Sequence, residues 1–157
     1  MDHISAEMIL AFHTAPAERS RELEAAVQPS DTLITELKSA DALLITAPIY
    51  NFSIPSSLKA WIDHVSRKGH TFAFENQTYR GLLNIQHAVI VCTYGTAEFR
   101  PGAQFSDQDF LQPYLSFVLS SLGVAKIDFV ALHGTTTDPA GLDVLYADAK
   151  RSLDLLL

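Results

Sequence analysis

The sequence predicts an α/β fold built on a parallel sheet of about three strands. Three short apolar runs, Ala42–Ile49, His87–Thr93 and Ile127–Leu132, alternate with segments of helical periodicity. Continuous apolar runs are typical of parallel strands covered on both faces, and amphipathic segments supply the covering helices. Because parallel strands are joined by right-handed crossovers, successive crossovers in one direction place their helices on the same face of the sheet.

Helices are expected before the first strand, within residues 1–40. The apolar residues of Ile4–Phe12 indicate a short helix or docking arm, and the charged run AERSRELEAAV indicates an exposed helix. Pro29 is expected to end that run, because proline removes a backbone N–H. Ser30 or Asp31 can then cap a new helix over TLITELKSA that leads into the first strand.

The rest of the chain continues the alternation. Pro55 suits the first position of a helix that runs to Arg67, with an apolar side at helical spacing. Residues 71–81 are polar and aromatic with two turn signals, as in a surface loop or short hairpin. Further helices are expected over Leu111–Leu122, ended by Gly123, and over Leu142–Leu156.

Length and composition favour one domain over residues 1–157, with a helical segment at 1–40 and strand–helix repeats at 41–157. The net charge of −7 argues against a nucleic-acid partner and an anionic membrane surface. No apolar run approaches the ~18 residues of a membrane span, and no signal peptide is recognisable, so a cytoplasmic location is expected. Cys92, in an apolar strand, is expected to be a core residue. The six histidines lack metal-ligand spacing and are expected to be satisfied surface or capping residues.

The stretch TAPIYNFSIPSSLKAWIDHV at Thr46–Val65, followed by RKGHTF, carries a family resemblance. It resembles the FMN-dependent NAD(P)H azoreductases and the related flavodoxin-like quinone reductases, and the similarity extends from Ser30 to the C-terminus. The resemblance implies a truncated flavodoxin-like three-layer sandwich. Members of that family begin with a βαβ unit that carries a phosphate-binding loop, and this sequence lacks one; loss of the beginning of the chain is an alternative explanation.

The resemblance also implies where a flavin would bind. Backbone N–H groups at the ends of two adjacent strands would bond the ring heteroatoms of FMN, with Tyr50 and Phe52 as apolar walls and Gly95 allowing close approach. The residues expected at this site are Pro48, Ile49, Tyr50, Asn51, Phe52, Thr93, Tyr94, Gly95 and Thr96. Tyr94 and Thr96 replace an arginine and a glycine that are usual in azoreductases. NADH or NADPH would reduce FMN, and a quinone or azo compound would then take the electrons, so no catalytic side chain is required.

The first strand, Ala42–Ile49, would be an exposed apolar edge if its usual neighbour is absent. A second copy of the chain or a separate partner is therefore expected to cover this edge and to complete the FMN site. The alternative function is a noncatalytic flavodoxin-like binding or scaffold subunit that has lost the phosphate loop.

Overall fold

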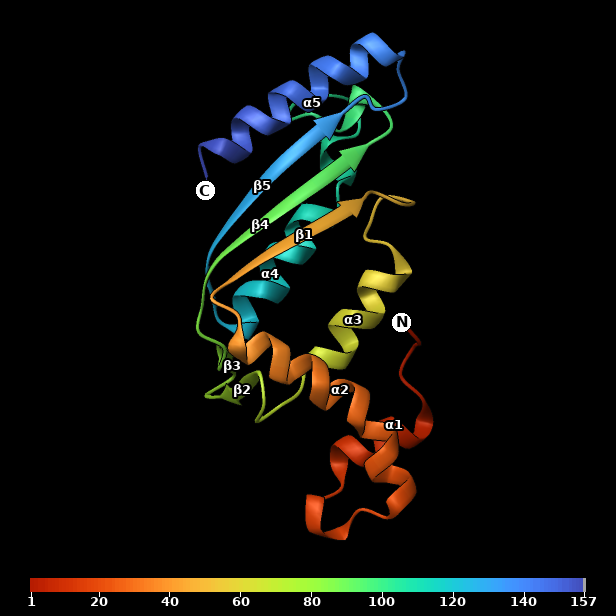
Figure 1. Ribbon diagram of the computed structural model, residues 1–157, viewed down its shortest axis with the longest axis vertical. Coiled ribbons are helices and arrows are strands. Elements are labelled where there is room, and N and C mark those ends of the chain that lie inside the picture. Colours follow the sequence, from red (N-terminus) through yellow and green to blue (C-terminus); the bar gives the residue numbers. More distant parts are fainter. Residues whose placement is uncertain (157) are drawn as a thin grey trace.

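The computed structural model describes residues 1–156, and its centre is a parallel sheet of three strands in the order β1-β4-β5. The strands are β1 (Ala42–Pro48), β4 (Ile85–Tyr94) and β5 (Val124–His133). Ile45 of β1 lies opposite Ile90 of β4, which lies opposite Phe129 of β5. The predicted α/β fold, its parallel pairing and the approximate positions of the three strands are confirmed (Figure 1).

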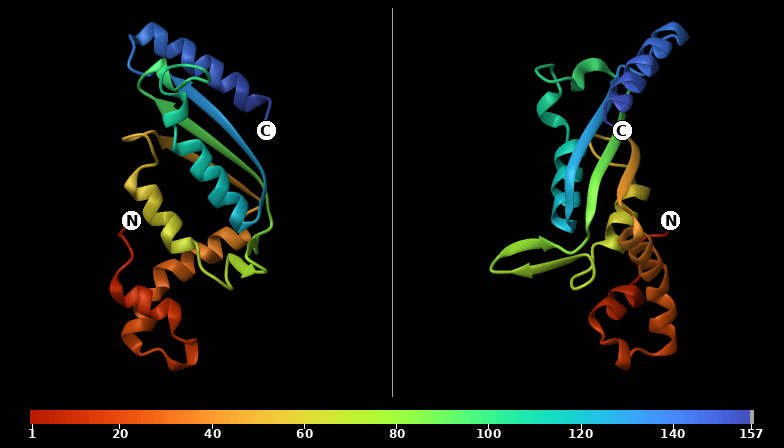
Figure 2. Two further views of the ribbon diagram at one scale, coloured as in Figure 1. Left: turned by 180° about the vertical axis from the view of Figure 1, so that it is seen from behind. Right: turned by 60° about the vertical axis from the view of Figure 1, so that its left-hand side comes forward.

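Helices α3 (Ser56–Val65) and α4 (Leu111–Leu122) cover one face of the sheet, and α5 (Pro139–Asp154) lies on the other (Figure 2). The larger core lies beneath α3 and α4, where residues such as Ile62, Ile90 and Leu119 are buried together. A smaller core joins α5 to β4 and β5. The shared side of α3 and α4 follows from the common hand of their crossovers.

Strand β1 is an edge strand within residues 1–156 and is only partly covered. Leu44 lies beside Val89 in the register, yet its side chain is 70% exposed, whereas Val89 is buried in the core beneath α5. Helix α5 therefore covers β4 and β5 and leaves the adjoining surface of β1 open. The expected exposed edge is present in the part of the chain that the structure describes.

The N-terminal segment folds into α1 (Ala6–His13), a short 3₁₀ turn at Pro16–Glu18, and the long helix α2 (Arg21–Ser39). The prediction that Pro29 ends a helix is wrong, because α2 continues through it. An interior proline costs about 3 kcal/mol. Val27, Ser30 and Ile34 are buried on one side of α2, and this tertiary packing offsets the lost hydrogen bond.

Arg67, just beyond α3, fastens the N-terminal helices to the sheet domain. Its side chain is 4% exposed, its Nη1 donates to Ser30 Oγ at 3.0 Å and contacts the Asp31 carboxylate, and its guanidinium lies 4.7 Å from the centre of the Phe12 ring. Ser30 Oγ in turn donates to the His64 carbonyl at 2.6 Å. One buried cation thus joins α1, α2 and the end of α3.

Residues 71–81 form the hairpin anticipated as one of two possibilities, with β2 (Phe72–Glu75) and β3 (Thr78–Gly81) paired antiparallel. The hairpin projects away from the body of the molecule (Figure 2). At its base, a Cβ on Gly81 would lie 2.2 Å from the Gly123 nitrogen, so only glycine permits this close approach. Gly123, with φ of +109°, also ends α4 as predicted.

Candidate functional site

The loop after β1 makes a tight two-residue turn. Tyr50 N donates to Ser53 O at 2.8 Å, and Ser53 N donates to Tyr50 O at 3.0 Å, which leaves Asn51 and Phe52 at the tip. Ile49 N donates to Thr93 O at 2.9 Å, so this loop lies against the end of β4. The tip is held from a third side by Phe110 N, which donates to Phe52 O at 2.9 Å.

Both residues at the tip have left-handed backbone conformations, with φ of 48° at Asn51 and 71° at Phe52. Asparagine tolerates this region, but a phenylalanine there is strained by roughly 1–2 kcal/mol. Strained residues that the surrounding structure holds in place cluster at functional sites. The conformation presents both residues to solvent, with the Phe52 ring centre 6.0 Å from that of Phe99.

The side chain of Tyr94, which is fully buried, holds the loop after β4 in place. Its hydroxyl donates to Asp109 Oδ2 at 2.7 Å and accepts from Gln112 Nε2 at 2.9 Å, and its ring stacks on His133 with centres 4.4 Å apart. Burial, and secondarily the bond to Asp109, raises the pKa of Tyr94, so the phenol stays neutral. Burial raises the pKa of the neighbouring Cys92 to about 12, which makes it an unreactive core thiol.

Asp109 also caps α4, because its Oδ1 accepts from Leu111 N at 2.8 Å. The Tyr94 carbonyl accepts from the backbone N–H groups of Gly134 and Thr135, each at 2.9 Å. The loop after β4 is therefore fixed by α4 on one side and by the loop after β5 on the other.

Four backbone N–H groups at these two strand ends donate no hydrogen bond to any residue within 1–156. They belong to Asn51 and Phe52 in the first loop and to Gly95 and Thr96 in the second. Because β1 and β4 are adjacent and parallel, the two pairs lie at the same edge of the sheet. Free donors at the carboxyl ends of parallel strands suit the acceptor atoms of a planar ligand.

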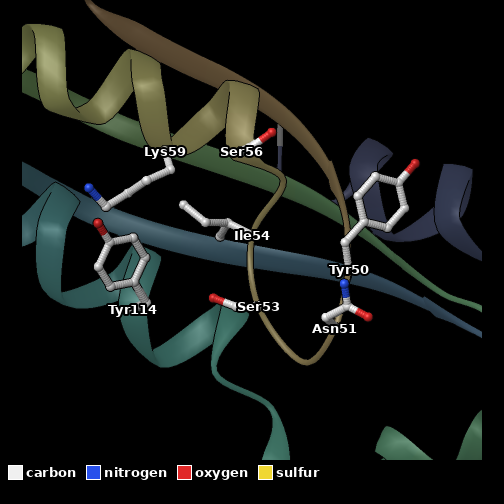
Figure 3. Close-up of a pocket in the computed structure, with 7 residues that line it drawn as sticks. All are labelled: Tyr50, Asn51, Ser53, Ile54, Ser56, Lys59 and Tyr114. Carbon is white, nitrogen blue, oxygen red and sulfur yellow. The ribbon is translucent and has the colours of Figure 1, made fainter. Parts of the chain in front are cut away.

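A cavity of about 510 Å³ opens on the other side of the first loop (Figure 3). It lies between that loop, the start of α3 and the side of α4, from which Tyr114 projects. Its lining consists of Tyr50, Asn51, Ser53, Ile54, Ser56, Lys59 and Tyr114. Among residues 1–156 there is no group of three or more His, Cys, Asp or Glu side chains that could hold a metal ion.

A family model described as flavodoxin-like fold matches residues 1–155. The chain belongs to this flavodoxin-like family. Its curated relatives include the FMN-dependent NADH:quinone oxidoreductase of Xanthobacter autotrophicus, 44% identical over 126 residues, which cover 80% of this chain and 61% of that protein. The FMN-dependent NADH:quinone oxidoreductase 2 of Trichormus variabilis is 32% identical over 151 residues, covering 96% of this chain and 73% of the relative.

The solved structures show the same fold. An FMN-dependent NADH-azoreductase from Bacillus anthracis, crystallised in complex with FMN, superimposes with a TM-score of 0.83 at 23% identity, covering 99% of this chain and 75% of that one. The resemblance identified from Thr46–Val65 is thereby confirmed. The flavodoxin-like chain spans about three fifths of the length of its Xanthobacter relative.

The residues expected at the site are brought together by the fold, with one difference in how they are presented. Tyr50 and Phe52 are exposed beside the free N–H groups, Pro48 and Thr93 are paired across the strands, and Gly95 is exposed. Tyr94 itself offers no exposed atom to a ligand, because the whole residue is buried and its carbonyl already accepts from Gly134 N and Thr135 N. A Cβ on Gly95 would lie 3.1 Å from Thr136 Oγ1.

Sequence reasoning missed two groups of side chains. Asp109, Gln112 and His133 stabilise the second loop from 15 to 39 positions away, and Lys59 and Tyr114 meet at the cavity from different helices. No local pattern signals either group. The surface assignment of the histidines is wrong for His64, whose side chain is buried with an Nδ1 that has no partner among the described residues.

Burial also lowers the pKa of His133, with Arg100 as the next cause. His133 therefore stacks on Tyr94 as a neutral ring at neutral pH. Like that of His64, the Nδ1 of His133 is buried without a partner in the described part of the chain. The prediction of satisfied histidines is wrong at this position too.

Proposed function

We propose that this flavodoxin-like chain binds the ring of FMN in a NAD(P)H-dependent quinone or azo reductase. The observation that carries the proposal is the set of four free N–H groups at the ends of β1 and β4. The names of the relatives, FMN-dependent NADH:quinone oxidoreductases, point to the same cofactor, donor and acceptor. When bound, FMN passes two electrons from NAD(P)H to the acceptor in a ping-pong cycle.

The residues of this chain fit the ring portion of FMN. Asn51, Phe52, Gly95 and Thr96 would donate backbone hydrogen bonds to the ring heteroatoms, and the exposed Tyr50 and Phe52 rings would shield it from water. The Tyr94–Asp109 bond would keep the second loop in place. No side chain is assigned a catalytic role, because the role of the protein is to position and enclose the ring.

The residues do not provide for the phosphate of FMN. The sequence has no glycine-rich loop of the types that cradle phosphates at a helix N-terminus. Each charge-assisted hydrogen bond to phosphate contributes roughly 1.5–3 kcal/mol. We therefore expect these residues alone to bind FMN little better than a flavin without phosphate.

The open edge of β1 supports a further part of the proposal. A strand with one unpaired edge and an exposed apolar side chain such as Leu44 recruits other strands. Another polypeptide, a second copy or a separate partner, would pair with this edge and contribute phosphate-binding donors. Light scattering of the purified chain at micromolar concentration tests this part, and a stable monomer that binds FMN tightly would contradict it.

The experiment for the flavin site compares FMN with riboflavin, which has the same ring and no phosphate. At concentrations where light scattering shows the 157-residue chain to be a monomer, quenching of flavin fluorescence on titration should give dissociation constants within about threefold of each other. The Gly95→Val variant should weaken binding of both flavins, because its side chain crowds Thr136 and the face of the loop.

Oxidation of NADH by a quinone in the presence of FMN then tests turnover. A chain that binds neither flavin, and that consumes no NADH when FMN is added, would refute the proposal and leave the noncatalytic binding subunit as the better interpretation. Thermal unfolding of Gly95→Val followed by circular dichroism checks that the variant is folded.

A further inference from the structure

The cavity between α3 and α4 is large enough for a small aromatic molecule. Its volume of about 510 Å³ falls within the range of ligand sites in proteins. Figure 3 shows Tyr50 and Asn51 at one end and Lys59 with Tyr114 at the other, with Ile54 between them. Asn51 also belongs to the proposed flavin site, so the cavity opens directly beside it.

The polar side chains of the cavity are available to a ligand. The amide of Asn51 and the hydroxyls of Ser53, Ser56 and Tyr114 make no hydrogen bond to any residue within 1–156. Hydroxyl and amide groups that converge on a cavity without partners provide the few polar contacts by which a ligand is oriented. The side chain of Ile54 and the ring of Tyr114 provide apolar contact for the body of the same molecule (Figure 3).

Lys59 is the only charged residue in the lining, although the chain as a whole carries a net charge of −7. Its ammonium pairs with Asp63, one turn further along α3 and outside the lining. An ammonium has three N–H donors, so Lys59 can bond Asp63 and an anion together. The first N–H groups of α3, at Ser56 and Ser57, have no backbone partner in the described chain and add positive potential at the same end.

Tyr114 complements Lys59 as a neutral donor. Burial raises the pKa of Tyr114, with Lys59 opposing and Asp63 adding to the change. The phenol therefore keeps its proton at neutral pH and can donate it in a hydrogen bond. Lys59 and Tyr114 face the same space from two helices, which gives one charged and one neutral donor for the same group of oxygen atoms (Figure 3).

We propose that this cavity is a subsite for an aromatic electron acceptor that carries a sulfonate or carboxylate, with the anionic group bound by Lys59 and Tyr114. The inference rests on the proposed reductase function for the identity of the ligand as an acceptor. The aromatic body lies along Ile54, toward the flavin site at Asn51. The cavity thus selects among acceptors by their charge.

Direct binding tests the subsite without turnover. Isothermal titration of the 157-residue chain, without NADH and both with and without FMN, compares azobenzene-4-sulfonate with the neutral 4-(hydroxymethyl)azobenzene. The sulfonate should bind about tenfold more tightly, as expected for one charge-assisted hydrogen bond. Lys59→Met should remove this preference, and Tyr114→Phe should reduce it.

Asp63→Asn gives a change of opposite sign, because it frees Lys59 from its carboxylate partner and should increase the preference for the sulfonate. Lys150→Met, which removes a lysine on the exposed side of α5, is the matched control and should leave the preference unchanged. Circular dichroism melts confirm that each variant is folded. Raising the salt concentration should weaken binding of the sulfonate and spare the neutral compound.

Equal binding of the two azobenzenes, or a preference that survives Lys59→Met, would overturn the proposal. NADH is titrated as a third ligand, because its phosphates carry anionic oxygens as the sulfonate does. If Lys59→Met weakens NADH binding and leaves the sulfonate unaffected, the cavity belongs to the electron donor and the acceptor assignment is refuted. None of these results depends on flavin binding, so failure of the reductase proposal and failure of the subsite are distinguishable.

Discussion

The left-handed conformation of Phe52 predicts an unusual order of stability for two substitutions. Phe52→Ala and Phe52→Gly both remove the ring and its contact with Phe99, so their difference reports on the backbone alone. At an ordinary position glycine is less stable than alanine by about 0.5–1 kcal/mol, because it loses more conformational freedom on folding. At φ of 71° the order should be reversed.

The expected magnitude follows from two opposing effects. A residue with a Cβ in the left-handed region is disfavoured by about 1–2 kcal/mol. Subtracting the entropy penalty of glycine leaves Phe52→Gly more stable than Phe52→Ala by about 0.5–1 kcal/mol. For a chain of this length that difference corresponds to about 1–4 °C in the midpoint of thermal unfolding.

Urea denaturation followed by circular dichroism measures both free energies of unfolding. Phe74 is the matched control, because it lies in strand β2 without a positive φ and is 47% exposed, against 45% for Phe52. There the glycine variant should be the less stable of the pair. If alanine is the more stable residue at position 52 as well, the turn is not strained and the interpretation of this loop as a conformationally constrained site is refuted.

The buried ion pair and the histidines give two further predictions. Asp31→Asn should lower the free energy of unfolding in urea by about 2 kcal/mol, because it leaves the Arg67 cation buried without an anion. Arg67→Met should lower it less, because the Asp31 side chain is 41% exposed and can be solvated, and the reverse order would contradict this account. Arg80→Met, in the exposed ion pair of the hairpin, is the control and should have no measurable effect. Burial, followed by the nearby Arg67, lowers the pKa of His70, so the unfolded chain binds more protons below about pH 6.5 and stability should fall as the pH falls through that value. His70→Gln should reduce the loss of stability between pH 7.5 and 5.5 without abolishing it, since the pKa of His133 is lowered too, and an unchanged pH dependence would count against it.

Much of the fold could be predicted because its signals are local. The apolar runs of β1, β4 and β5, the periodicity of α3 and the glycine that ends α4 each depend on residues close together in the sequence. The Pro29 prediction was wrong for a tertiary reason. A proline lowers the stability of a helix taken alone, and only the burial of one side of α2 determines that the helix continues.

The candidate site, too, could be predicted where its signals are local and not where they depend on tertiary packing. The motif at Thr46–Val65 identified the family and the strand-end loops, since a turn between a buried strand and an amphipathic helix is written in consecutive residues. The sequence could not show that Tyr94 turns inward to Asp109, because the choice between a buried and an exposed side chain depends on a partner 15 positions away.

The sequence by itself determined the parallel α/β architecture, the family and the two strand ends at which a flavin ring is proposed to bind. Only the tertiary structure decided which donors at those ends are free, how Phe52 is strained and that Lys59 meets Tyr114 across a cavity. Periodicity and turn chemistry act between neighbours along the chain. Cavities, unpaired donors and buried charges arise where helices and strands pack, and their positions are fixed by contacts between residues far apart in the sequence.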